Sequence, residues 1–107
     1  MTSNSDTQST FIFQRITIIG IGLIGSSFSR ALKSKAGLVE EIIATDSDKD
    51  NLAKASDLGI VDTICDDINE AVSRSDCVIL CTPISTYEKI VKQIAPSLPA
   101  GCVLSDV

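Results

Sequence analysis

The chain has 107 residues, the length of one domain, and 44% of them are apolar, which is enough for a buried core. A net charge of −5 and the absence of a Lys/Arg run argue against binding to nucleic acid or to an anionic membrane. No apolar run approaches the ~20 residues of a membrane span, so we expect one globular domain without nucleic-acid or membrane partners.

The first ten residues are rich in Ser, Thr, Asn and Gln, and they lack the basic and apolar regions of a secretory signal. We interpret residues 1–10 as a disordered tail and residues 11–107 as the domain. Four cysteines stand at positions 65, 77, 81 and 102, the chain has no His, and the spacing does not suit zinc. We therefore expect reduced thiols, no metal and a cytoplasmic protein.

Strands and helices are predicted to alternate along the rest of the chain. Apolar and β-branched segments predict strands at 15–19, 41–45, 60–64, 77–81 and 102–104, with an earlier start at Phe11 left open for the first. Helical periodicity and capping residues predict helices at 23–33, from Ser47 or Asp48 to 58, at 68–74 and at 87–94. This alternation predicts an α/β fold, a Rossmann-type doubly wound parallel sheet in the order 3-2-1-4-5.

Helical spacing also predicts which side chains face the core. In the first helix these are Leu23, Ile24, Phe28, Ala31 and Leu32. In the second and the last helix they are Leu52, Ala55, Leu58, Ile90, Val91 and Ile94. Other polar residues are interpreted as solvated surface, loop or cap positions: Asp57, Asp62, Asp66, Asp67, Tyr87, Glu88 and Lys89.

Residues 20–25 have the pattern G-x-G-x-x-G, directly after the first predicted strand and at the start of the first helix. In this context the pattern is typical of dinucleotide binding, although a glycine-rich turn in another kind of α/β protein is the alternative. Gly20 permits the tight turn, Gly22 lets a pyrophosphate approach the backbone, and Gly25 allows close packing of helix on strand. The free N–H groups of the helix would face the phosphates.

Asp46 follows the second predicted strand, 21 residues after Gly25. A carboxylate at this position can accept hydrogen bonds from both hydroxyls of an adenosine ribose. Its alternative role is to cap the next helix, which Ser47 or Asp48 could also do. We predict that Asp46 is the ribose ligand and that the cofactor is NAD.

Cys81, Thr82 and Pro83 stand at the carboxyl end of the fourth predicted strand. In an open parallel sheet this end borders the crevice at the topological switch point, where ligands bind. We predict that Thr82 and the backbone around it contact the nicotinamide ribose. The alternative is that Thr82-Pro83 merely ends the strand.

Three segments carry a resemblance to a known family: ITIIGIGLIGSSFSRAL at 16–32, DCVILCTPI at 76–84 and CVLSDV at 102–107. On these segments the chain resembles the N-terminal NAD-binding domain of the prephenate/arogenate (cyclohexadienyl) dehydrogenase family. The resemblance extends from residue 16 to residue 107, which is nearly all of the expected domain but only the first domain of the family.

The resemblance implies a longer parent enzyme that carries out the oxidative decarboxylation of prephenate or arogenate in tyrosine biosynthesis, with NAD as cofactor. By the family pattern, the cofactor-binding residues are Gly20, Gly22, Leu23, Ile24, Gly25, Asp46, Ser47, Cys81, Thr82 and Pro83. Ser105 and Asp106 would approach the substrate side. The catalytic serine and histidine of the family would follow Val107, as would its helical, dimer-forming second domain, so this fragment is expected to be inactive.

Two other classes remain open at this point. A β-hydroxyacid dehydrogenase or an imino-acid reductase shares the fold but usually has Met or Ala where Ile24 stands. A non-enzymatic nucleotide-sensing domain shares the glycine turn and the acidic residue but does not need Thr82-Pro83. The sequence does not tell whether the substrate is prephenate or arogenate. It also does not tell whether the parent enzyme carries a fused mutase or regulatory domain.

Overall fold

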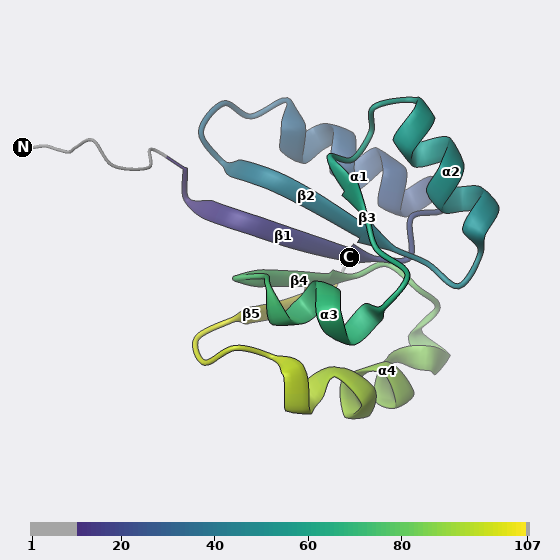
Figure 1. The fold of residues 1–107 in the computed structure, drawn as a ribbon, viewed down its shortest axis with the longest axis vertical. Helices are drawn as coiled ribbons and strands as arrows, with labels where there is room; N and C mark the ends of the chain where they lie inside the picture. The colour runs from purple at the N-terminus through teal and green to yellow at the C-terminus, as the bar shows by residue number, and fades with distance from the viewer. Residues whose placement is uncertain (1–10, 107) are drawn as a thin grey trace, which may run out of the picture.

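The computed structural model describes residues 11–106, so the tail expected at residues 1–10 lies outside the described residues. In this part of the chain five strands and four α-helices alternate (Figure 1). They are β1 (Phe13–Ile19), α1 (Leu23–Lys33), β2 (Val39–Thr45), α2 (Lys49–Asp57), β3 (Thr63–Ile64), α3 (Ile68–Ser73), β4 (Cys77–Leu80), α4 (Tyr87–Ile94) and β5 (Val103–Asp106). Two short 3₁₀ turns, η1 (Ile84–Thr86) and η2 (Ala95–Ser97), flank α4.

The five strands form one parallel sheet in the order β3-β2-β1-β4-β5, which confirms the predicted topology. Strand β1 lies in the centre. Its last residue, Ile19, pairs with Thr45 of β2 and with Leu80 of β4. The segments that leave these three strands therefore meet at one edge of the sheet, because the carboxyl ends of parallel strands point the same way.

Each face of the sheet has its own hydrophobic core. Helices α1 and α2 cover one face, and α3 and α4 cover the other (Figure 1). Alternate residues of β1 enter the two cores: Ile18 packs in the cluster that contains Leu52 of α2, and Ile19 packs with Val72 and Ile94 of α3 and α4. A central strand buried on both faces in this way is expected to be almost wholly apolar, as β1 is at its carboxyl end.

The inward face of α1 differs from the predicted one. Three of the five residues expected to face the core are exposed: Leu23, Ile24 and Ala31. The helix instead buries Gly25 and Ser29, and the Ser29 hydroxyl donates a hydrogen bond of 2.7 Å to the carbonyl of Ile60. The glycine lets α1 approach β1 so closely that the small residues, spaced four apart, turn inward. Leu23 and Ile24 are displaced outward, while Phe28 and Leu32 stay partly buried against the core as predicted.

Smaller differences concern the ends of elements. Strands β1 and β2 begin two residues before the predicted starts, because Phe13 and Val39 extend the paired register. Strand β3 is reduced to two residues, and β5 runs to Asp106. Leu58, expected to face the core, is 66% exposed because it lies beyond the last turn of α2 as its C-cap.

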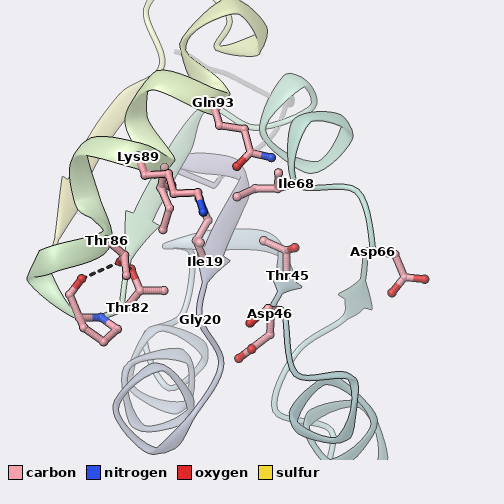
Figure 2. A pocket seen from close by; sticks show the side chains of 13 residues that line it. Ile19, Gly20, Thr45, Asp46, Asp66, Ile68, Thr82, Thr86, Lys89 and Gln93 are labelled. Atoms are coloured by element: carbon pink, nitrogen blue, oxygen red, sulfur yellow. Dashed lines mark hydrogen bonds between the residues drawn. The ribbon is translucent and has the colours of Figure 1, made fainter.

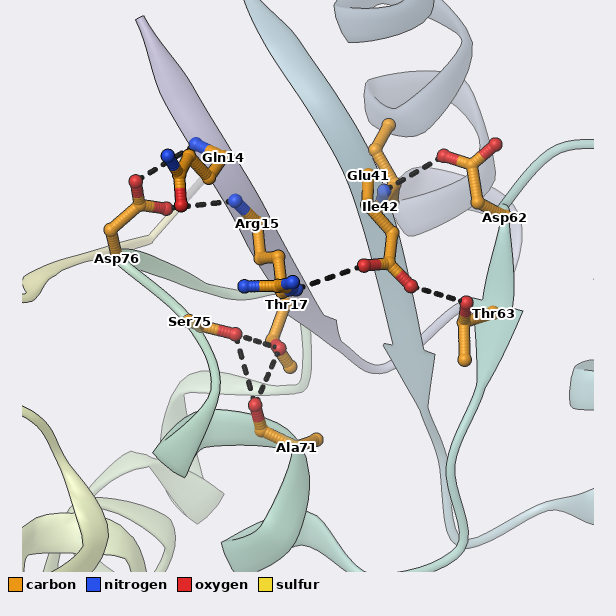
Figure 3. Close-up of polar contacts among 10 residues, drawn as sticks. All are labelled: Gln14, Arg15, Thr17, Glu41, Ile42, Asp62, Thr63, Ala71, Ser75 and Asp76. Atoms are coloured by element: carbon orange, nitrogen blue, oxygen red, sulfur yellow. Dashed lines mark hydrogen bonds and ion pairs between the residues drawn. The ribbon is translucent and has the colours of Figure 1, made fainter. Parts of the chain in front are cut away.

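Two carboxylates bind the backbone of neighbouring strands (Figure 3). Asp76 accepts hydrogen bonds from the N–H groups of Gln14 at 2.8 Å and Arg15 at 3.0 Å. Asp62 is an exposed loop residue as predicted, and it also accepts a hydrogen bond from the N–H of Ile42 at 2.8 Å. These contacts tie β1 to β4 and β2 to the segment before β3, and they hold the sheet in the register that aligns its carboxyl ends.

Candidate functional site

A cavity of about 450 Å³ opens at the carboxyl ends of β1, β2 and β4 (Figure 2). It brings together five of the predicted site residues: Gly20, Asp46, Ser47, Thr82 and Pro83. The other five do not line it: Gly22, Leu23, Ile24, Gly25 and Cys81. The cavity thus joins the glycine turn, the acidic residue after β2 and the Thr-Pro segment after β4, three segments distant from one another in the sequence.

Two of the three glycines are required by close contacts. Gly20 has a φ of +93°, and a Cβ there would lie 2.8 Å from the Thr82 methyl carbon. A Cβ on Gly25 would lie 2.1 Å from the carbonyl oxygen of Gly20, which no side chain can do. A Cβ on Gly22 would meet nothing within 4 Å. The structure therefore explains Gly20 and Gly25 by the turn and the helix packing, whereas Gly22 faces open space.

The amino end of α1 has no side-chain cap. Gly22 is its N-cap. In this helix, all of whose residues the structure describes, no side chain caps the first turn and the first turn contains no acidic residue. The side chains of Leu23 and Ile24 are 86% and 64% exposed. Free N–H groups and the positive end of the helix dipole are therefore available to a negatively charged ligand beside Gly22.

The Asp46 carboxylate holds the glycine turn as well as facing the cavity. Its Oδ2 accepts a hydrogen bond of 2.8 Å from the N–H of Ile21, inside the turn. Its Oδ1 accepts one of 2.8 Å from the N–H of Asp48, and the amide of Asn51 lies 3.4 Å from Oδ2. Asp48, and not Asp46, caps α2, since its side chain accepts from the second and third residues of that helix. The carboxylate of Asp46 is therefore pre-oriented at the mouth of the cavity.

Sequence reasoning missed one wall of the cavity. Lys89, interpreted above as surface, lines it together with Thr86, Ile90 and Gln93 on the α4 side. Ile68 and Asp66 line the α3 side, Asp66 as the exposed loop residue that we predicted. Spacing would have revealed the α4 wall, because positions 86, 89, 90 and 93 fall on one helix face. Among residues 11–106, Lys89 forms no ion pair, so its ammonium group is available to a ligand.

The cysteine nearest the site, Cys81, is partly buried, and Cys77 on the same strand is buried. Burial raises the pKa of both Cys77 and Cys81 to about 11, and for Cys77 the neighbouring Cys102 and Asp76 add to the effect. A thiol with this pKa stays protonated and is a poor nucleophile at neutral pH. All four cysteines are free in the structure.

We therefore expect Cys77 and Cys81 to react with iodoacetamide at pH 8 at least about tenfold more slowly in the folded chain than in the urea-unfolded chain. The raised pKa lowers the thiolate fraction, which is the reactive form. Mass spectrometry of tryptic peptides after timed quenching measures each site separately, and the urea-unfolded chain is the control. Equal rates in the two states would contradict the burial of these thiols.

Within residues 11–106 no helix is long and apolar enough to cross a membrane. In the same range, no three His, Cys, Asp or Glu side chains gather where they could hold a metal ion.

The strand order, the glycine turn after the central strand and the carboxylate after β2 together define a Rossmann domain of the nucleotide-binding class. Comparison with known families agrees with this class and identifies the family. The chain belongs to the prephenate dehydrogenase family, because the family model for "Prephenate dehydrogenase, nucleotide-binding domain" matches residues 28–107. This membership decides among the three classes that the sequence had left open.

Individual relatives support the same family. The chain is 34% identical over 97 residues to cyclohexadienyl dehydrogenase of Zymomonas mobilis, covering 89% of this chain and 32% of that protein. It is 37% identical over 95 residues to prephenate dehydrogenase of Lactococcus lactis, covering 87% and 26%. The crystal structure of prephenate dehydrogenase from A. aeolicus in complex with hydroxyphenyl propionate and NAD+ superimposes with a TM-score of 0.78 at 27% identity, covering 87% and 32%. The chain thus spans about a third or less of these proteins.

Proposed function

We propose that this domain binds NAD across the carboxyl edge of its sheet. The observation that carries the proposal is the position of Asp46, whose carboxylate faces the same cavity as the glycine turn and is held there by two backbone N–H groups. The adenosine ribose would donate its hydroxyls to Asp46, and the pyrophosphate would lie at Gly22, against the open amino end of α1. The NAD+ complex of the A. aeolicus relative supports this choice of cofactor.

Thr82 and Pro83 share this cavity with Asp46, and Cys81 does not line it. We propose, as predicted from the sequence, that Thr82 and the backbone around it contact the nicotinamide ribose. Leu23 and Ile24 contribute through their backbone in the first turn of α1, since their side chains point to solvent.

We further propose that the full-length parent is a cytoplasmic, homodimeric prephenate or arogenate dehydrogenase of tyrosine biosynthesis. In this reaction the substrate ring loses a hydride to the nicotinamide, its carboxyl leaves as carbon dioxide, and the ring becomes an aromatic phenol. The part of residues 1–107 is to bind and orient the cofactor. The chain contains no His, so the imidazole of the family's acid/base would have to come from elsewhere in the parent.

The purified 107-residue chain should therefore bind NAD with one site per chain and show no turnover. Isothermal titration calorimetry measures the binding, and absorbance at 340 nm with NAD and either prephenate or arogenate measures the reaction. Absence of NAD binding would refute the nucleotide-binding proposal. Measurable growth at 340 nm would show that the catalytic groups lie within these residues.

A further inference from the structure

We infer that Thr86 is a positioning residue, which holds Thr82 in one rotamer between the glycine turn and the cavity. The inference rests on the proposed function, since Thr82 matters to binding only if the cavity takes the cofactor. Thr86 belongs to η1, the short turn between β4 and α4.

The Thr86 hydroxyl lies within hydrogen-bond distance of two oxygens. It donates its single hydrogen to the carbonyl oxygen of Pro83 at 2.6 Å, and its oxygen shares a hydrogen bond of 2.8 Å with the hydroxyl of Thr82 (Figure 2). The Thr86 N–H also donates to the Pro83 carbonyl, at 2.9 Å. Thr86 thus closes the turn with two hydrogen bonds to Pro83, one from its backbone N–H and one from its hydroxyl. The same hydroxyl oxygen contacts the side chain of Thr82, four residues earlier.

The contact fixes both branches of the Thr82 side chain. With Oγ1 held by Thr86, the methyl group is directed at Gly20, where a Cβ would lie only 2.8 Å from it. Rotation of this β-branched side chain about χ1 would move Oγ1 away from Thr86 and the methyl group away from Gly20.

This arrangement links the Thr-Pro segment to the glycine turn. Gly20 and Thr82 both line the cavity that Asp46 faces, so a ligand in the cavity lies beside the contact between them. A Thr82 that is held in place presents its side chain to a ligand with little loss of side-chain entropy on binding. Thr86 lines the cavity too, but its hydroxyl is already engaged with Pro83 and Thr82, and we assign it the positioning of Thr82.

The first test is a set of NAD titrations on the 107-residue chain with matched variants. Thr86→Val keeps the shape and removes the hydroxyl, and it should weaken binding about threefold to tenfold, as expected for one lost hydrogen bond. Thr86→Ser keeps the hydroxyl and should bind within about twofold of the wild type. A Thr86→Val chain that binds like the wild type, or a Thr86→Ser chain that binds like Thr86→Val, would overturn the inference.

A double-mutant cycle separates positioning from a general structural effect. If Thr86 acts through Thr82, the Thr82→Val/Thr86→Val chain should bind NAD no more weakly than Thr82→Val alone. Additive losses would refute the positioning role. A Thr86→Val chain that melts earlier but keeps its NAD affinity would refute it as well. A wild-type chain that does not bind NAD at all contradicts the proposed function instead.

The second test needs no variant and is independent of folding defects. Three-bond NMR couplings report the χ1 rotamer of Thr82 in the wild-type chain. We expect a single rotamer, together with a nuclear Overhauser contact between the Thr82 methyl and Gly20. Couplings averaged over several rotamers in the wild type would overturn the inference.

Discussion

Replacing Gly25 with Ala should strongly destabilise the domain. The added Cβ would lie 2.1 Å from the backbone oxygen of Gly20, and neither backbone can move without separating α1 from β1. Overpacking of this kind costs about 3 kcal/mol or more, because both groups are main chain. For a domain of this size the midpoint of thermal unfolding should fall by roughly 10–20 °C. Circular dichroism at 222 nm during heating measures it.

Gly22, three residues earlier in the same turn, is the matched control. Its Cβ would meet nothing within 4 Å, and its φ of −66° suits any residue. Gly22→Ala should therefore change stability by less than about 1 kcal/mol, the loss expected at an N-cap. A Gly25→Ala chain that melts with the wild type would show that α1 does not approach β1 as described.

The same pair of positions separates folding from binding. Gly22→Val should fold but bind NAD about 10- to 100-fold more weakly, because its side chain occupies the space assigned to the pyrophosphate, at a cost of about 1–3 kcal/mol. Calorimetric titration measures the loss, and the melting curve of each variant shows that the fold is retained. Wild-type affinity in Gly22→Val would place the phosphates elsewhere.

The wild-type domain should prefer NAD over NADP by about 100-fold. A 2′-phosphate would replace a hydroxyl donor to Asp46, a charge-assisted hydrogen bond of about 1.5–3 kcal/mol. It would also set a like charge near the carboxylate, which costs on the order of 4 kcal/mol at 4 Å and an effective dielectric constant of 20. Solvent screening and the uncommitted ammonium of Lys89 in the same cavity reduce the sum to the stated preference.

Asp46→Asn is the informative variant for this preference. The single amide oxygen can still accept from the N–H of Ile21, so the glycine turn is kept, while the hydrogen bond from the N–H of Asp48 and the negative charge are lost. The preference for NAD should then fall below about tenfold, chiefly through a gain in NADP affinity, which titration with both cofactors measures. Equal affinities of the wild type for the two cofactors would refute the assignment of Asp46 to the ribose.

Local patterns determined much of this fold. The bounds of α1 agree with the prediction residue for residue, and Asp48 caps α2 as one of two predicted caps, because helix starts depend on neighbours within a turn. The strand order followed from the alternation of strands and helices, since a right-handed crossover leaves few topologies. The positions of Gly20 and Asp46 at one edge of the sheet followed from the same argument.

Only the tertiary structure showed which side chains are buried or line the cavity where segments distant in sequence pack together. The burial of Gly25 in place of Leu23 arises from the approach of α1 to β1, which periodicity alone does not encode. The entry of Lys89 into the cavity depends on how α4 packs against the sheet. Sequence spacing reports which residues share a helix face, but the neighbour that this face meets is set by packing between elements far apart in the chain.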